Sequence, residues 1–209
     1  MPWAPVPGGR AVGITWLLSS SPCSAPDVAS HPHVIDHWNG TLMPSDLLSI
    51  TLPAAGDPPA AHPAERLMPL DQSQRENLAR LYLASYPPQV GAEDLDDARR
   101  EIDETFTGQF GTLRTDASWL ARVRGRPAGA ILVVERSIWD DHLDGPFVID
   151  LFVHPEARGL GLGRSLVLAA MEACTSAGDR QLSLRVGQGT SSAAHGLYRG
   201  LGFTTVQTT

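Results

Sequence analysis

The chain has 209 residues, of which 42% are hydrophobic and 19% are charged, and its formal net charge is −7 at pH 7. This length and composition fit a globular protein with one hydrophobic core, plus either a small second module or a long arm. The acidic charge argues against nucleic acid as the main partner, because phosphate backbones attract clustered basic side chains. No apolar run approaches the roughly 18 residues that a membrane-spanning helix needs, so we expect no membrane partner.

The sixteen lysine and arginine positions are all arginine, which is typical of a bacterium with a GC-rich genome. The start of the chain resembles a signal peptide only weakly, because its apolar part is short and no clear cleavage site follows it. We therefore expect a cytoplasmic protein. Two cysteines, Cys23 and Cys174, are too few for a disulfide framework or a zinc site, and Cys174 fits the apolar stripe of a helix.

The first 64 residues differ in character from the rest of the chain. They contain most of the prolines but only one of the sixteen arginines. Short apolar runs at 12–18, 34–38 and 47–52 could be strands, and the Pro- and Ala-rich segment 52–63 is typical of a linker. We predict that residues 1–64 form an arm that packs on a main domain formed by residues 65–209.

A regular pattern begins after this arm. Asp71 is a candidate N-cap before a helix at 75–85, and a second, strongly acidic helix is expected at about 92–106. Three apolar runs then predict strands, with a turn at 125–127 between the first two. These strands are expected at 119–123, 130–134 and 147–153.

A glycine-rich turn joins the third of these strands to a helix. Gly159, Gly161 and Gly163 let the backbone approach a ligand, and the first turn of the helix leaves N–H groups unpaired at its positive end. This combination predicts a seat for phosphate oxygens. The spacing fits neither a nucleotide P-loop nor a dinucleotide fingerprint.

The helix after the turn ends at Gly178, a natural C-terminal cap. A strand at 181–186, a helix at 192–200 and a short strand near 203–206 complete the pattern.

Two segments together resemble the GNAT superfamily of N-acetyltransferases. The first is Arg158-Gly159-Leu160-Gly161-Leu162-Gly163, and the second runs from Ser191 through Leu197-Tyr198 to Gly202-Phe203. The resemblance covers roughly residues 65–209. It implies an α+β fold with a mixed, mainly antiparallel central sheet and helices on both faces. That family usually continues with one more strand, which here is absent, clipped, or supplied by the N-terminal arm or a second subunit.

The resemblance also implies acetyl-CoA as co-substrate and a set of residues that bind it. A bulge in the third strand would splay it from its neighbour and free main-chain groups for the pantetheine arm. Asparagine usually stands at the position of Ser191. The cofactor-binding residues implied are Leu151, Phe152, Val153, Arg158, Gly159, Leu160, Gly161, Leu162, Gly163, Arg164 and Ser191.

Three residues are candidates for catalysis. Tyr198 is either a core aromatic or, as the resemblance implies, the acid that protonates the departing thiolate. Asp150 interrupts an apolar strand, where an unpaired carboxylate is costly, so it either binds or deprotonates the acceptor or forms a buried salt bridge. Glu135 closes the preceding strand and could assist, whereas His154 fits a loop residue better than a base.

The expected acceptor is a small cationic amine. The loop at 139–144 and the acidic helix would attract positive charge, although both could equally be solvated surfaces. A non-catalytic CoA-binding sensor and a protein or peptide N-acetyltransferase stay open, and a tRNA-directed enzyme is disfavoured by the charge. A homodimer is left open. No metal is expected, because His31, His33 and His37 lack zinc-type spacing.

Overall fold

The computed structural model describes most of the chain. Residues covered in full are 45–54, 67–87, 90–187 and 190–206, and the backbone alone is described for 13–14, 34–36 and 41–43. His31, His33 and His37, and most of the first predicted strand at 12–18, lie outside the described residues.

The described residues form ten strands, four α-helices and two short 3₁₀ turns. The helices are α1 (Arg75–Ser85), α2 (Leu95–Thr107), α3 (Leu162–Ser176) and α4 (Ser192–Leu201), and the 3₁₀ turns are η2 (Gln72–Gln74) and η3 (Pro155–Ala157). The strands are β1 (Gly13–Ile14), β2 (Val34–Asp36), β3 (Thr41–Met43), β4 (Asp46–Thr51), β5 (Leu67–Pro69), β6 (Trp119–Val123), β7 (Arg126–Val134), β8 (Phe147–Val153), β9 (Gln181–Val186) and β10 (Thr204–Thr205).

One sheet organises the fold. Its strand order is β10-β4-β9-β8-β7-β6-β5, with β1 also paired to β8, while β2 and β3 form a separate hairpin. The β8–β9 pair is parallel, and the other pairs are antiparallel. The predicted mixed, mainly antiparallel sheet is therefore confirmed.

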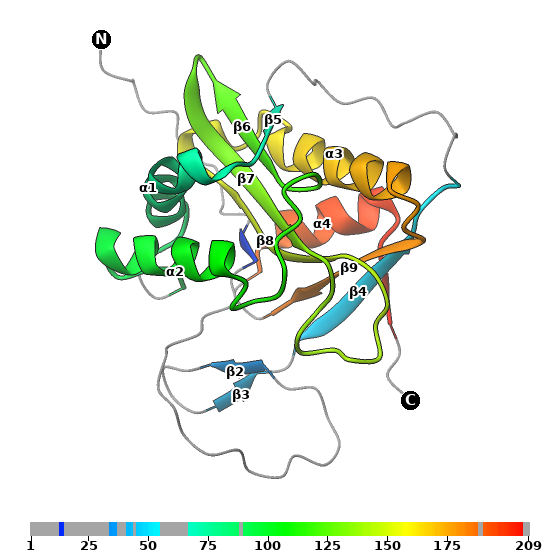
Figure 1. Ribbon diagram of the computed structural model, residues 1–209. Helices are drawn as coiled ribbons and strands as arrows, with labels where there is room; N and C mark the ends of the chain where they lie inside the picture. Colours follow the sequence, from blue (N-terminus) through cyan, green and yellow to red (C-terminus); the bar gives the residue numbers. More distant parts are fainter. Residues whose placement is uncertain are drawn as a thin grey trace.

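Helices cover both faces of this sheet, as Figure 1 shows. Alternate residues of β7 point to opposite faces: Ile131 and Val133 join the core under α3 and α4, whereas Leu132 and Val134 join the core under α1 and α2. This period-two alternation in an almost wholly apolar strand is what a sheet buried on both faces requires.

Strand β4 comes from the N-terminal part of the chain but lies inside the main sheet. It pairs with β9 along its whole length, from Asp46 opposite Val186 to Thr51 opposite Gln181, and its other edge pairs with β10. The run predicted at 47–52 is thus a strand, and the N-terminal part of the chain supplies a strand beside the last strands of the sheet. The division of the chain at residue 64 remains a prediction.

Several local expectations need correction. Asp71 caps η2, where its side chain accepts from the Ser73 N–H, and this turn leads into α1. Strand β7 begins at Arg126 rather than 130, because a register shift in the β6–β7 pair accommodates Pro127, which has no N–H to donate. Strand β5 was not expected. None of the helices in the described part of the chain is long and apolar enough to span a membrane.

Candidate active site

The glycine turn adopts the conformation that its sequence demands. Gly159 and Gly161 both have φ of +79°, and a Cβ at either position would meet nothing within 4 Å. Glycine is therefore needed there for backbone conformation rather than for space. Gly161 is the N-cap of α3, so the first-turn N–H groups of a 15-residue helix face the turn. The exposed Leu160 stands at its tip.

Strands β8 and β9 separate beside this turn. They pair in parallel only at Phe147–Ser183 and Val148–Leu184, although β8 continues to Val153. The cause is a bulge: Leu132 pairs with Asp150 and Val133 with Val148, which leaves Ile149 as the extra residue of β8. The structure therefore contains the splayed strand pair that the resemblance implied.

The open edge of β8 is not free in this structure. Leu151 pairs with Ile14 and Phe152 with Gly13, in antiparallel register, while the opposite edge of β8 is occupied by β7. The main-chain groups predicted to pair with pantetheine are thus paired within the chain. A ligand that used Leu151 and Phe152 in this way would have to displace β1, and their cofactor role stays a prediction.

The two arginines that flank the glycine turn are placed differently. The guanidinium of Arg158 donates to the Val153 carbonyl at 3.1 Å and to the Ser85 carbonyl at 2.7 Å, so it ties β8 to the end of α1. Partial burial lowers the pKa of Arg158. Arg164 is exposed in the first turn of α3. Arg164 could make its predicted contact with diphosphate from this exposed position. Arg158 would first have to break its hydrogen bonds to the Val153 and Ser85 carbonyls.

Ser191 and the second motif build the start of α4. The Ser191 side chain accepts from the Ala194 N–H at 3.2 Å, the bond expected of an N-cap serine. This cap fixes the helix that carries Tyr198. A pantetheine contact for Ser191 is not tested by this bond and remains a prediction.

Asp150 lies on β8, two residues beyond the point where its parallel pairing with β9 ends. It is 7% exposed, and the Tyr86 hydroxyl donates to its Oδ1 at 2.5 Å. No arginine or histidine of the described residues forms an ion pair with it, so the alternative of a buried salt bridge is not supported. Burial raises the pKa of Asp150 well above its usual value, and negative charge on Glu101 raises it further.

Tyr198 is fully buried on α4 and packs edge-on against Phe203, with ring centroids 5.6 Å apart. Its hydroxyl has no hydrogen-bond partner among the described residues. Burial raises the pKa of Tyr198 well above its usual value, and the charge of Asp150 adds to the effect. A buried hydroxyl without a partner is uncommon, and it is consistent with a group that bonds to a ligand.

A small hollow of about 20 Å³, with room for about one water molecule, opens on the α1–α2 side of Asp150. Its walls come from both helices, from β7 and β8, and from the loop between those strands. The lining residues are Tyr82, Glu101, Ile102, Thr105, Phe110, Leu132, Trp139, Ile149 and Asp150. Aromatic and aliphatic walls therefore surround two carboxyl groups, and a ligand larger than a water molecule would have to widen this hollow.

Sequence reasoning did not single out Glu101. The acidic helix was predicted, but the residue of α2 that faces inward was not identified. The pattern offered a signal: Ala98, Ile102 and Thr105 are buried along one face of α2, and Glu101 lies beside that face. Burial and the neighbouring Glu104 raise the pKa of Glu101 to about 8.

Two other candidates lie elsewhere. Glu135 is exposed at the end of β7 and does not line the hollow, because the chain turns outward there; its N–H donates to the Thr112 carbonyl. His154 caps η3, where its Nδ1 accepts from the Glu156 N–H. Neither residue lines the hollow beside Asp150.

The loop between β7 and β8 is held by a buried ion pair. Arg185 of β9 donates to both carboxylate oxygens of Asp140, and the two side chains are 1% and 0% exposed. Ser137 also donates to Asp140, and Arg185 donates to Ser45. The pair fixes the loop segment next to Trp139, which lines the hollow.

Comparison with known proteins gives one family and a shared fold. A model of the Acetyltransferase (GNAT) family matches residues 75–203, and a search of curated proteins found no match. Among solved structures, PH1933 from Pyrococcus horikoshii OT3 is 20% identical with a TM-score of 0.55, and the match covers 69% of this chain and 91% of that one.

Two further structures are those of enzymes. AAC(6')-Iy, solved with the bisubstrate analogue CoA-S-monomethyl-acetylneamine, is 18% identical with a TM-score of 0.53; 68% of this chain and 92% of that chain are covered. The ribosomal-protein-S18-alanine N-acetyltransferase from Escherichia coli is 16% identical with a TM-score of 0.50, and the coverage is 68% and 78%. At these identities the likeness shows the fold.

Proposed function

The chain belongs to the acetyltransferase (GNAT) family, and we propose that it is an acetyl-CoA-dependent N-acetyltransferase that acts on a primary amine by direct attack. Family membership supports acetyl transfer in general. Two observations support the finer proposal: Asp150 lines the hollow under α1 and α2, and its charge acts on the buried hydroxyl of Tyr198.

The residues present fit acetyl-CoA. The positive-φ glycines and the N-terminal turn of α3 suit its diphosphate. The β8 edge beyond its pairing with β9 suits its pantetheine arm once β1 is displaced. The unpartnered hydroxyl of Tyr198 is buried, and the charge of Asp150 acts on it. When bound, acetyl-CoA supplies an acetyl group already activated as a thioester. The protein's task is then to position groups and move protons.

Asp150 and Tyr198 have complementary proton-handling properties. The raised pKa of Asp150 makes its carboxylate a stronger base than an ordinary aspartate. It therefore takes a proton from an acceptor ammonium more readily. The raised pKa of Tyr198 keeps its phenol protonated, and it holds a proton for a leaving sulfur. Tyr86 orients Asp150 through the bond to Oδ1.

We further propose that the acceptor is a small cationic amine. Two carboxyl groups line the hollow, and its other walls are mostly apolar. AAC(6')-Iy binds a bisubstrate analogue that contains acetylneamine, whereas the Escherichia coli enzyme is named for an alanine of a ribosomal protein. We propose an acceptor of the first kind, because two carboxyl groups line the hollow.

A thiol-release assay with acetyl-CoA and a panel of amines tests the proposal, with peptide amines as the second arm. Replacing Tyr198 with phenylalanine is expected to lower kcat by about 10- to 100-fold while the Kd for CoA, measured by calorimetry, changes little. A wild-type protein that binds CoA but releases no thiol with any amine would instead identify a CoA sensor on the same fold.

A further inference from the structure

A tyrosine at the end of α1 holds the carboxyl group of Asp150. Tyr86 is the C-cap of α1, and its N–H donates to the Tyr82 carbonyl at 3.3 Å. Its hydroxyl donates to Oδ1 of Asp150 at 2.5 Å, while the Leu151 carbonyl is a more distant acceptor at 3.5 Å. Tyr86 and Asp150 are each 7% exposed. Water therefore competes little for this bond, and a hydroxyl bonded to a carboxylate in such a site is held strongly.

The bond acts against two influences that discourage ionisation of Asp150. Burial raises the pKa of Asp150 most, and the charge of Glu101, which faces it from α2, raises it further. The bond from Tyr86 lowers this pKa, and the main chain of Leu151 lowers it to a smaller extent. Tyr198 of α4 adds no charge, because its own raised pKa keeps the phenol protonated. Tyr86 is therefore the described side chain that favours the ionised form of Asp150.

A glycine outside the cofactor motifs provides the space for the Tyr86 side chain. A Cβ added at Gly91 would lie 2.5 Å from the Cβ of Tyr86, and 3.2 and 3.3 Å from its Cγ and Cδ2. Gly91 is not one of the positive-φ glycines, so space and not backbone conformation requires glycine there. The Gly91 N–H donates to the Pro87 carbonyl at 3.0 Å, which holds this glycine against Tyr86. Any larger residue at position 91 would push the tyrosine aside.

Other contacts oppose a displacement of Tyr86. Its ring lies edge-on to the Tyr82 ring, with centroids 5.1 Å apart, and its centroid is 6.1 Å from that of Phe152. The carbonyl of the preceding residue, Ser85, accepts from the guanidinium of Arg158 at 2.7 Å. A ring pushed by a residue at position 91 would disturb these contacts and carry the hydroxyl away from Asp150.

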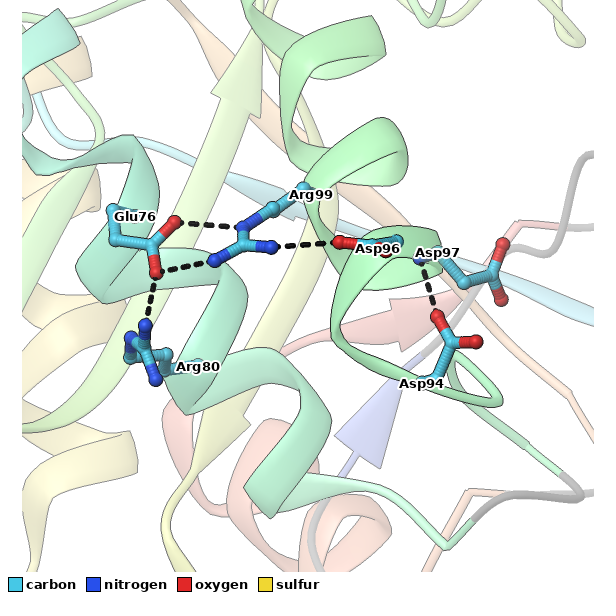
Figure 2. A network of polar contacts seen from close by, with 6 residues as sticks. All are labelled: Glu76, Arg80, Asp94, Asp96, Asp97 and Arg99. Atoms are coloured by element: carbon cyan, nitrogen blue, oxygen red, sulfur yellow. Dashed lines mark hydrogen bonds and ion pairs between the residues drawn. The ribbon is translucent and has the colours of Figure 1, made fainter.

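The helix that ends at Tyr86 is also held on its outer side. Glu76 of α1 accepts two bonds of 2.9 Å from Arg99 of α2, and Arg80 pairs with the same carboxylate, as Figure 2 shows. Arg99 also bonds Asp96. This network of exposed side chains links the two helices without involving the carboxyl group of Asp150. The position of Tyr86 is thus set by the packing of α1, and Tyr86 can impose an orientation on Asp150.

We propose that Tyr86 is a positioning residue that prepares Asp150 for proton transfer, and that Gly91 acts through Tyr86 by giving it the space it needs. This inference rests on the proposed function, in which Asp150 takes a proton from the acceptor. The bond to Oδ1 fixes the orientation of the carboxylate. It also offsets part of the cost of burying a negative charge, so that Asp150 can lose its proton and act as a base.

The first test is a pH titration of Asp150 that needs no acceptor. The carboxyl ¹³C chemical shift would be followed in protein labelled at aspartate and assigned with Asp150→Asn. Tyr86→Phe removes the hydroxyl and keeps the ring, so it should raise the pKa of Asp150. Gly91→Ala should raise it in the same direction. In the Tyr86→Phe background, Gly91→Ala should add nothing, because no hydroxyl remains to be displaced.

The second test measures thiol release against pH with the most active amine of the panel. Both single variants should lower kcat/KM about tenfold on the acidic limb of the profile, where Asp150 is mostly protonated, and much less at high pH. The acceptor's own titration is common to all variants and cancels in the comparison. A purely structural role for Tyr86 would lower kcat/KM equally at every pH.

Gly200→Ala is the matched control, because Gly200 is exposed on α4 and an added Cβ there would meet nothing within 4 Å. It should leave the titration of Asp150 unchanged. An unchanged titration in Tyr86→Phe overturns the inference, even if Gly91→Ala does not fold, and leaves the proposed function intact. An unchanged titration in Gly91→Ala, or a shift that persists in the Tyr86→Phe background, overturns the role of Gly91. No thiol release with any amine overturns the proposed function and with it the part of Tyr86 in proton transfer.

Discussion

Replacing Glu101 with glutamine is expected to stabilise the protein at pH 8 and to change its stability at pH 5 much less. Burial, with the charge of Glu104, raises the pKa of Glu101 from 4.5 to about 8. The folded chain thus keeps a proton that the unfolded chain releases, so its stability is fullest below pH 4.5 and falls as the pH rises toward about 8. At 1.36 kcal/mol per pKa unit the fall is at most about 5 kcal/mol, and relaxation of the site reduces the expected value to about 2 kcal/mol.

Glutamine suits this test because it has nearly the size of a protonated carboxyl and does not titrate. Urea unfolding followed by circular dichroism at pH 5, 6.5 and 8 would measure the free energy of unfolding for the wild type and Glu101→Gln. The increase in the free energy of unfolding caused by Glu101→Gln should become larger as the pH rises. A gain that is equal at all three pH values, or a variant less stable than the wild type at pH 8, would refute the assignment of Glu101 as a buried carboxyl. Glu104→Gln should show a smaller pH-dependent gain, because it removes only the neighbouring charge.

Three further outcomes are expected. Arg185→Met should lower the free energy of unfolding by about 3 to 5 kcal/mol, because it leaves Asp140 buried without its cation; a urea midpoint close to the wild type would contradict this. Deletion of residues 1–30 should tighten CoA binding about tenfold in calorimetry, because it frees the β8 edge that β1 occupies, and unchanged affinity would show that β1 does not compete. Gly161→Ala should lower the free energy of unfolding by about 1 kcal/mol, because Gly161 has a positive φ. Gly163 lies in the helix, and an added Cβ would contact Leu197 at 3.5 Å, so Gly163→Ala should leave the free energy of unfolding unchanged or raise it.

Local signals predicted most of the elements around the site. Strand β8, the glycine turn and α3 follow one another within a short stretch, and each is encoded by its own residues: a nearly continuous apolar run, positive-φ glycines and a helical stripe. Asp150 was noticed because a carboxylate in an apolar strand is unusual. The motif near Tyr198 likewise depends on residues that are close together in the sequence.

The remaining features depend on pairing between distant segments, which sequence spacing does not specify. Glu101 could not be separated from the other acids of α2, because which of them faces inward depends on how α2 packs against α1 and β8. The guanidinium of Arg158 bonds the end of α1, and only the folded chain brings Ser85 near it. Glu135 was expected to help because it closes β7, yet the strand ends with this side chain exposed.

Strand β4 has a consequence for how the chain acquires its fold. The hydroxyl of Ser183 on β9 donates to that of Ser49 on β4 across 134 residues of sequence. During synthesis β4 leaves the ribosome long before β9 and β10 have been made, so both of its edges stay unpaired during that time. Contacts between such distant segments form slowly. The final folding event is therefore expected to be the insertion of an early-made strand between two late-made ones, and a nascent chain that stalls before β9 would be prone to aggregate.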